Sequence, residues 1–309
     1  MASKPKTAAA STVPTAAIFR KLAETEKPFV LPGVHDGLSA RLAELAGFKG
    51  VFMGGFASLG ARHAVPDVGL MGLADISAIA RDVRAATSLP FMVDADDGYG
   101  DAKNVAHTVR TYERLGVQAI FLEDQVSPKR CGHLAGKRIV SAERMVTKIR
   151  AAAAERTSLF IVARTDARSV AGMDEALRRG ERYLRAGADA IYVESPESVA
   201  ELEQCGRAFE ALSMTSMLEG GKTPILKPSE LYAMGFNIVI YGITLLLRIA
   251  RTMQLALEDL KSERLELVGS GVSFDEYMRI VGLERWSAIE RRLTSSALTV
   301  DQPMCYDHI

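Results

Sequence analysis

The chain has 309 residues, of which 48% are hydrophobic, so it can bury a large core. Lysine and arginine (38) balance aspartate and glutamate (38), and the formal net charge is zero. Nucleic-acid and polybasic membrane partners both require summed positive charge, so this balance argues against both. The length allows two domains, although closed α/β barrels of about 250 residues are a common exception.

Three cysteines, at positions 131, 205 and 305, are an odd and sparse set. They indicate thiols in a reducing compartment rather than a disulfide framework. The longest apolar run, around residues 238–247, is about half of what a membrane span needs. Residues 1–17 resemble neither a signal peptide nor a transit peptide. We therefore expect a cytoplasmic protein with a flexible N-terminal tail over residues 1–25.

Short apolar or β-branched runs recur along the chain, and a helical pattern follows each. Near-continuous apolar strands that alternate with helices predict a parallel sheet covered on both faces. Eight such units favour a closed (β/α)8 barrel of the TIM type, because a doubly wound sheet usually has fewer strands. The expected strands are residues 29–34, 50–54, 91–96, 119–124, 159–166, 190–195, 214–218 and 237–241.

The chain continues beyond what a barrel needs. A long helix is expected over residues 244–261, and residues 273–293 form a further helical pattern that contains the only tryptophan, Trp286. We therefore expect a barrel over residues 26–262 and a C-terminal helical arm and tail over residues 263–309. Such an apolar arm suggests docking to another subunit; the alternative is that it packs back on its own barrel.

Charged residues end most of the expected strands. In a barrel of this kind the carboxyl ends of all strands meet at one mouth, where active sites lie. Asp94 and Asp96 are two residues apart, so an ideal strand would point both to the same side. Unpaired carboxylates are costly to bury, which favours a hard cation such as Mg²⁺ over a pair that only stabilises a loop.

A second cluster, Lys129-Arg130-Cys131-Gly132-His133, follows the fourth expected strand. It places a thiol beside an imidazole and two cations, in a polar stretch where no core would form. Nearby positive charge lowers the pKa of a thiol, so we interpret Cys131 as catalytic rather than as an inert buried cysteine.

Arg164 ends an apolar run within the fifth expected strand. A buried arginine needs an anionic partner, and its planar fork suits a carboxylate or a phosphate. The alternative to substrate binding is an ion pair with Glu123, Asp166 or Glu194, and the two can coexist.

Taken together, these segments resemble the isocitrate lyase/phosphoenolpyruvate mutase superfamily. The resemblance rests on residues 93–100, 122–125, 128–133 and 163–167 (VDADDGYG, LEDQ, PKRCGH and ARTDA), and order and spacing match over residues 29–261. Residues 31–36, 66–69 and 219–224 look most like the branch of dimethylmalate lyases and petal death protein, with methylisocitrate lyases next. Phosphoenolpyruvate mutases proper replace the Cys-Gly-His element, which argues against that reaction here.

The resemblance implies a barrel whose C-terminal helices swap between subunits of a homotetramer, a dimer of helix-swapped dimers. It also implies Mg²⁺, or Mn²⁺ in its place, bound by Asp94, Asp96 and Glu123. Cys131 would be the acid, on a loop that closes over a small organic acid. Arg164 would bind a substrate carboxylate, while His133 and Glu194 complete the polar shell. The residues expected to contact substrate are Gly54, Gly55, Phe56, Asp67, Gly132, Ser216 and Gly242.

Three positions depart from the family pattern. Gly54 and Ser216 stand where relatives commonly carry serine and asparagine, and Gly242 lies where relatives carry residues that tune specificity. The expected reaction is cleavage of a 2-hydroxy di- or tricarboxylate, of the 2,3-dimethylmalate or methylisocitrate type, to a 2-oxo acid and a second carboxylate. The alternatives are an oxaloacetate hydrolase or decarboxylase, a carboxyphosphonoenolpyruvate-type phosphonomutase, and a non-catalytic barrel that binds organic acids.

Overall fold

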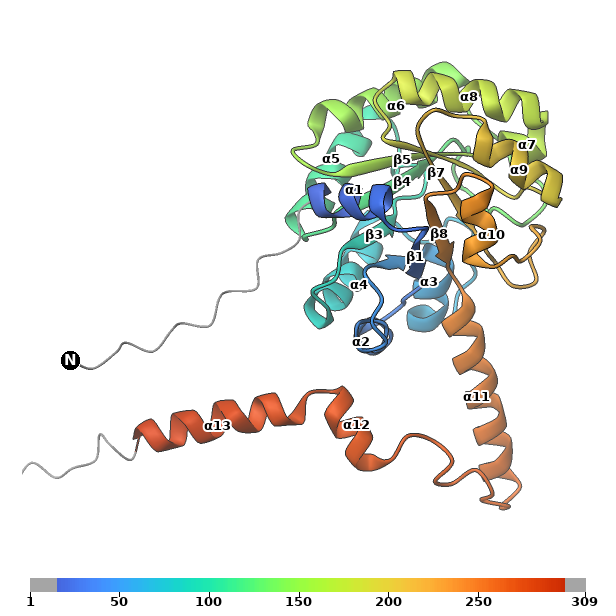
Figure 1. Cartoon of the computed structure of the whole chain (residues 1–309). Coiled ribbons are helices and arrows are strands. Elements are labelled where there is room, and N and C mark those ends of the chain that lie inside the picture. The colour runs from blue at the N-terminus through green and yellow to red at the C-terminus, as the bar shows by residue number, and fades with distance from the viewer. Residues whose placement is uncertain (1–15, 298–309) are drawn as a thin grey trace, which may run out of the picture. The chain divides into compact units, whose positions relative to one another are not determined.

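The computed structural model describes residues 16–297, and eight parallel strands form its centre (Figure 1). Neighbouring strands pair in the order β1-β8-β7-β6-β5-β4-β3-β2. An isolated parallel bridge between Gly33 and Phe52 brings β1 beside β2, so the sheet closes on itself. The expected (β/α)8 barrel is confirmed. The strands are β1 (Phe29–Pro32), β2 (Val51–Met53), β3 (Phe91–Asp94), β4 (Ala119–Glu123), β5 (Phe160–Thr165), β6 (Ala190–Val193), β7 (Leu212–Ser216) and β8 (Ile238–Tyr241).

Helices surround the strands and bury their outer face (Figure 1). Large apolar side chains such as Phe52, Phe121 and Tyr192 fill the inner face. Because both faces of each strand are buried, the strands read as near-continuous apolar runs in the sequence. The surrounding helices are α2 (Gly37–Leu45), α3 (Gly55–His63), α4 (Leu73–Ala86), α5 (Ala102–Arg114), α6 (Ala142–Glu155), α7 (Ala167–Ala171), α8 (Met173–Arg185), α9 (Val199–Arg207) and α10 (Pro228–Ala233).

Helix α1 (Ala16–Thr25) closes the amino end of the barrel. Its Phe19 is fully buried, and the ring lies 5.2 Å from the ring of Phe29 and 5.3 Å from that of Phe160. These two rings begin β1 and β5, so α1 covers the end of the barrel opposite the strand tips. The expected N-terminal tail is therefore wrong for residues 16–25, and residues 1–15 lie outside the described part of the chain.

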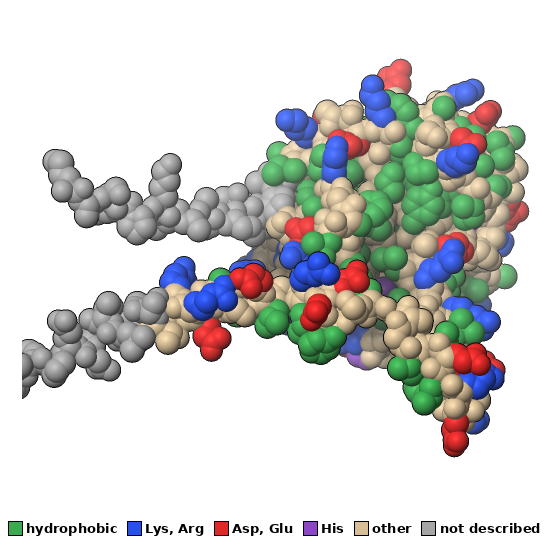
Figure 2. Space-filling view, turned by 60° about the horizontal axis from the view of Figure 1, so that its bottom comes forward, with side chains coloured by type: hydrophobic (Ala, Val, Ile, Leu, Met, Phe, Trp, Pro, Cys, Tyr) green, Lys and Arg blue, Asp and Glu red, His purple; other side chains and the backbone are tan. Residues whose placement is uncertain are grey.

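The chain divides into two compact units, and the boundary between them along the chain falls within helix α11 (Thr244–Lys261), between Arg251 and Thr252. The boundary thus precedes the expected one at residue 262. The second unit contains α12 (Phe274–Ile280) and α13 (Leu283–Ala297), and apolar side chains are exposed along it (Figure 2). Trp286 is 65% exposed there. Exchange of these helices between subunits stays a prediction.

Across residues 16–297, no helix combines the length and the apolar character that a bilayer span requires.

Substituting Phe19→Ala should lower the free energy of unfolding by about 3–5 kcal/mol, because it opens a cavity between α1 and the barrel floor. The neighbouring Ile18 is 45% exposed, so Ile18→Ala should change it by only about 0.5 kcal/mol. Urea unfolding of the two variants and the parent chain measures both values. Equal effects from the two substitutions would show that α1 does not dock as described.

Candidate active site

The carboxyl ends of the strands enclose a narrow cavity of about 50 Å³. Aside from Asp96 and Glu123, which are buried beside the cavity, every residue expected from the sequence to act on substrate or metal lines it. The structure therefore brings together segments that are far apart along the chain. The expected residues that line the cavity are Gly54, Gly55, Phe56, Asp67, Asp94, Cys131, Gly132, His133, Arg164, Glu194, Ser216 and Gly242.

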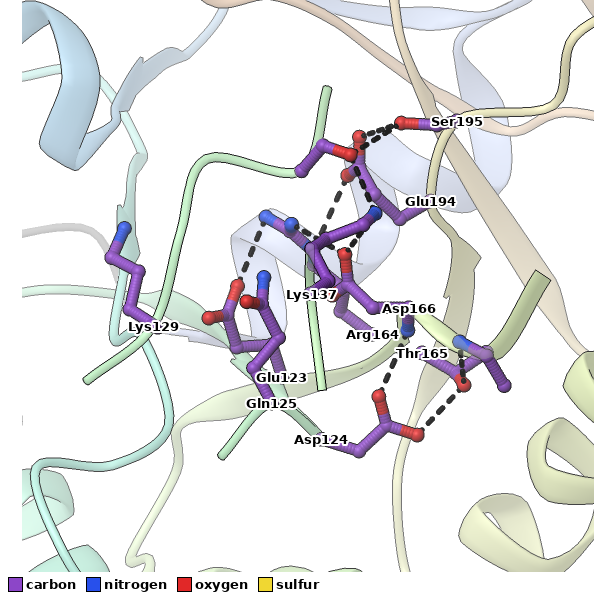
Figure 3. A network of polar contacts seen from close by, with 12 residues as sticks. Glu123, Asp124, Gln125, Lys129, Lys137, Arg164, Thr165, Asp166, Glu194 and Ser195 are labelled. Carbon is purple, nitrogen blue, oxygen red and sulfur yellow. Dashed lines mark hydrogen bonds and ion pairs between the residues drawn. The ribbon is translucent and has the colours of Figure 1, made fainter. Parts of the chain in front are cut away.

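Arg164 lies at the carboxyl end of β5 and contacts three carboxylates: one from β4, one that follows β6, and one two residues further along its own segment (Figure 3). Its guanidinium lies 3.2 Å from Glu123, 3.0 Å from Asp166 and 3.3 Å from Glu194. Burial alone would lower the pKa of Arg164, but these three carboxylates outweigh burial and raise it. The ion pairs expected for Arg164 are confirmed, and its role in binding a substrate carboxylate stays a prediction.

Lys129 forms a second centre of positive charge. Its Nζ lies 2.6 Å from Oδ1 of Asp67 and 2.6 Å from Oδ1 of Asp96. Burial would lower the pKa of Lys129, but Asp96, Asp94 and Asp67 outweigh it and raise the value. The ammonium group therefore stays charged although its side chain is only 6% exposed.

The expectation that Asp94 and Asp96 share one side of a strand is wrong. Strand β3 ends at Asp94, and Asp96 has a left-handed backbone (φ 48°), so the chain turns between them. The backbone N–H of Asp96 donates to Oδ1 of Asp94 at 2.9 Å. This turn leaves Asp94 in the cavity wall and aims Asp96 at Lys129. Non-glycine residues with such a backbone are uncommon and concentrate at functional sites.

The site buries more carboxyl groups than basic groups. Six carboxylates (Asp67, Asp94, Asp96, Glu123, Asp166 and Glu194) surround three permanent cations (Lys129, Lys137 and Arg164), linked by the contacts above and below.

Burial and mutual repulsion raise the pKa values of several of these carboxylates. The pKa of Asp96 rises to about 7, and those of Asp94 and Glu123 also lie above their ordinary values. Oε1 of Glu123 is buried without a hydrogen-bond partner. Oδ1 of Asp67 and Oδ1 of Asp96 each form an ion pair with Lys129, but neither oxygen accepts a hydrogen bond. Hard oxygen donors with surplus negative charge fit a divalent cation such as Mg²⁺.

The expected metal ligands do not form a ready-made metal cluster. Within residues 16–297, no three His, Cys, Asp or Glu side chains converge on one point. Asp96 pairs with Lys129, and Glu123 pairs with Arg164. The donor types therefore match a hard cation, while the arrangement in which they would hold it stays a prediction.

Cys131 lies on the connection between β4 and α6 and lines the cavity. Burial raises the pKa of its thiol to about 11; Asp67 and Glu194 add to the rise, while Arg164 opposes it. The expected lowering by nearby cations is therefore wrong. Lys129 turns toward Asp67 and Asp96, and burial outweighs the remaining charges. The thiol keeps its proton at neutral pH, which suits a proton donor.

His133 and Glu194 complete one side of the cavity. Nδ1 of His133 accepts a hydrogen bond from the backbone N–H of Lys222 at 2.9 Å, which leaves Nε2 to carry the ring proton. That Nε2 lies 3.2 Å from Oε1 of Glu194. Burial alone would raise the pKa of Glu194, but Arg164 and His133 outweigh it and hold the pKa well below its ordinary value.

The apolar wall of the cavity was not predicted from the sequence. Phe52, Phe121, Tyr192, Leu218, Ile240 and Ile243 line it, and they lie in or next to strands, where they read as ordinary core residues. A Cβ at Gly54 would meet the ring of Phe52 at 2.9 Å, whereas one at Gly242 would meet it at 3.5 Å. A side chain at position 54 would therefore require the Phe52 ring to shift, while position 242 has room for one.

The raised pKa of Cys131 predicts slow alkylation. At pH 8 iodoacetamide should modify Cys131 on the order of 100-fold more slowly than a cysteine in an unfolded peptide, because the thiolate is the reactive form. The rate should rise about tenfold per pH unit from pH 8 to pH 10. Mass spectrometry of the modified peptide measures it. A rate that levels off below pH 9 would contradict the raised pKa.

Comparison with known proteins agrees with this geometry. The family model for phosphoenolpyruvate phosphomutase matches residues 19–261. The chain is 41% identical over 280 residues to a 2,3-dimethylmalate lyase of Eubacterium barkeri, covering 89% of this chain and 97% of the relative. It is 40% identical over 236 residues to a 2-methylisocitrate lyase of Bacillus subtilis (strain 168), covering 76% and 78%.

The fold is likewise that of known members. A solved oxaloacetate acetylhydrolase in complex with the inhibitor 3,3-difluorooxalacetate matches with a TM-score of 0.86 at 31% identity, covering 90% of this chain and 97% of the other. The resemblance drawn from the motifs is therefore confirmed. The chain belongs to the phosphoenolpyruvate phosphomutase family, and within the isocitrate lyase/PEP mutase superfamily it is a carbon–carbon lyase.

Proposed function

We propose that this protein is a Mg²⁺-dependent lyase that cleaves a 2-hydroxy di- or tricarboxylate of the 2,3-dimethylmalate or methylisocitrate type. The products are a 2-oxo acid and a second carboxylate. The observation that carries the proposal is that one cavity joins a protonated thiol, Cys131, with Asp94 and the buried guanidinium of Arg164. The substrates named for the lyases among its relatives indicate the substrate class.

The carboxylate cluster supports Mg²⁺, or Mn²⁺ in its place, as the cofactor. Asp94, Asp96 and Glu123 would hold the ion, and the free Oε1 of Glu123 is one candidate ligand atom. When bound, the ion supplies positive charge to the 2-hydroxyl and carboxylate oxygens of the substrate. The six buried carboxyl groups outnumber Lys129, Lys137 and Arg164, which is why a further cation fits here.

Residues of the chain would supply the other parts of the reaction. The 2-hydroxyl would pass its proton to a carboxylate of the site, C2 becomes the carbonyl carbon of the 2-oxo acid, and the C2–C3 bond breaks. Its electron pair moves onto C3, beside the second carboxylate. Cys131 donates its proton to that carbon, and Arg164 offsets the negative charge that develops. The loop that carries Cys131 would keep bulk water from quenching the anion early.

Hydrolysis or decarboxylation of oxaloacetate is the second candidate, because the similar solved structure above is an oxaloacetate acetylhydrolase. A carboxyphosphonoenolpyruvate-type phosphonomutase uses the same kind of site. The family assignment disfavours the non-catalytic barrel. The room beside Gly242 and the ring of Phe52 at Gly54 distinguish this cavity from the expected family pattern, and they favour a substrate with an apolar substituent.

The proposal includes a cytoplasmic homotetramer in which neighbouring subunits exchange their C-terminal helices. Both units of the chain expose apolar stripes that a second copy would cover. In the barrel unit, α2 exposes Leu38, Leu42 and Leu45 at helical spacing. In the second unit, Phe274 is 76% and Trp286 is 65% exposed. Exposed apolar surface of this kind is typical of interaction sites.

Assays of 2-oxo acid release from a panel of 2-hydroxy and 2-oxo diacids, with phosphonopyruvate included, test the function. With the preferred substrate, Cys131→Ser should lower kcat by roughly 100- to 10,000-fold, because the proton donor is lost. Substrate affinity should stay nearly unchanged. Cys205 lies outside the cavity, so Cys205→Ala should keep parental activity. Full turnover by Cys131→Ser would refute the thiol as acid.

Removing divalent ions should abolish turnover, and Mg²⁺ should restore it. The cluster should also bind Mg²⁺ in calorimetry without substrate. Glu123→Gln replaces a carboxylate that the ion would bind with a neutral amide, and should weaken that binding by roughly tenfold or more. Activity that persists in excess chelator, together with no detectable Mg²⁺ binding, would contradict the cofactor assignment.

A further inference from the structure

The connection between β4 and α6, residues 124–141, is here called the site loop because it carries Cys131. Backbone and side-chain hydrogen bonds hold the base of this loop. The N–H of Val126 donates to the carbonyl of Arg138 at 2.8 Å. The side chain of Gln125 donates to the carbonyl of Arg130 at 2.8 Å and accepts from its N–H at 3.0 Å. Between these fixed points lie residues 131–136, of which Cys131, Gly132 and His133 line the cavity.

The carbonyl of Gly132 is one of three points at which this part of the loop is held. The N–H of Cys131 donates to the carbonyl of Asp67 at 3.1 Å, and Nδ1 of His133 accepts from the N–H of Lys222 at 2.9 Å. The Gly132 carbonyl accepts hydrogen bonds from Nζ of Lys137 at 2.5 Å and from Oγ of Ser195 at 3.0 Å. The Lys137 ammonium also donates to Oδ1 of Asp166 at 2.7 Å. The Lys137 side chain is 2% exposed and that of Asp166 is fully buried, so water does not replace these bonds.

Asp166 is itself held rigidly. Its backbone N–H donates to Oδ1 of Asp124 at 2.8 Å, and Thr165 donates to the other oxygen of Asp124 at 2.7 Å. Oδ2 of Asp166 accepts from Nε of Arg164 at 3.0 Å (Figure 3). One carboxylate therefore fixes both Lys137 and Arg164.

Gly132 lies closer to the site than any other residue type could. A Cβ at this position would lie 2.4 Å from Cδ of Glu194 and 2.5 Å from Nη2 of Arg164. The loop backbone is thus in direct contact with the residues expected to bind substrate. A bond that holds the Gly132 carbonyl sets how closely the loop approaches them.

Ser195 is the weaker of the two donors. Its single hydroxyl proton faces two acceptors, the Gly132 carbonyl at 3.0 Å and Oε1 of Glu194 at 2.8 Å. It can donate to only one of them at a time. Lys137 has three ammonium protons and needs only two for Gly132 and Asp166. Lys137 is therefore the donor that Gly132 keeps in both orientations of the Ser195 hydroxyl.

We propose that Lys137 is a positioning residue that latches the site loop: by joining the Gly132 carbonyl to Asp166, it places Cys131 over the cavity and aligns the loop with Arg164. Ser195 is an auxiliary latch. The effect on catalysis rests on the proposed function, whereas the placement of the loop does not.

Alkylation of Cys131 in the full-length protein at a fixed pH measures loop opening directly. Iodoacetamide labelling, followed by mass spectrometry, should be roughly 10- to 100-fold faster in Lys137→Met, the change expected when one charge-assisted hydrogen bond is lost. Ser195→Ala should raise it by roughly 2- to 10-fold. Labelling of the buried Cys205 in the same samples reports global unfolding and should not change.

Lys148 supplies a matched control, because its side chain is also 2% exposed and donates to the Asp97 carbonyl at 2.7 Å, away from the site loop. Lys148→Met should leave Cys131 labelling at the parental rate. The proposal is overturned if Lys137→Met labels Cys131 at the parental rate, or if Lys148→Met or Cys205 shows an equal rise. Should Lys137→Met not fold, a parental rate in Ser195→Ala overturns the proposal.

Kinetics separate the latch from the proposed function. In Lys137→Met, kcat/KM for the cleaved acid should fall by roughly 10- to 100-fold, in step with the faster labelling. A fall in kcat/KM without faster labelling would place Lys137 in the chemistry and overturn the latch. If the parent protein cleaves none of the tested acids, the proposed function is refuted. Faster labelling of Cys131 in Lys137→Met would still support the role of Lys137 in holding the loop.

Discussion

The burial of surplus negative charge around Arg164 and Lys129 is the constraint on which the site depends. Each cation contacts more than one carboxylate, and the pKa of each is raised although burial opposes it. A buried charge is tolerated only with partners, so the two cations hold the acidic strand ends together. Burial, together with repulsion from neighbouring carboxylates, raises the pKa values of Asp94, Asp96 and Glu123. Such a cluster of buried carboxylates favours the binding of a further cation, and the proposed reaction uses a bound Mg²⁺ ion.

The barrel brings these charged residues together at the carboxyl ends of its strands. Its strands are apolar on both faces, so polar residues gather where the strands end. Residues from β3 to β6 reach one cavity because neighbouring parallel strands end at the same edge. The site loop then covers the acids with a thiol that burial keeps protonated. In the proposed reaction, Arg164 would offset the charge of the anion and Cys131 would protonate it.

The barrel and most of the cavity lining follow from local patterns in the sequence. Apolar runs predict the strands to within two residues, because burial on both faces leaves a strong signal. The acidic residues that end these apolar runs identify the mouth of the barrel, because acidic side chains are otherwise absent from the strands. The pairing of Lys129 with Asp67 is not a local property, since the two residues are far apart in the chain. The pKa of Cys131 was expected to fall because its neighbours in sequence are cations, yet burial decides it.

Lys137 and helix α1 were also not predicted from the sequence, because their contacts are with residues that are distant in the chain. A lysine in a polar loop reads as a solvated residue, and only the fold brings it to Asp166. Phe19 follows an Ala- and Thr-rich segment that reads as a tail, and only the open floor of the barrel explains why it is buried. Where a residue acts through partners distant in sequence, periodicity and composition carry no signal for it.

The stereochemistry of proton delivery tests the central claim most directly. Cleavage of a 2,3-dimethylmalate-type acid in D₂O should place one deuterium on the carbon released from the broken bond, with a single configuration, because the thiol of Cys131 approaches from one face. NMR analysis of the product as a chiral derivative measures this. A racemic product, or a single configuration formed at the parental rate by Cys131→Ser, would contradict the account.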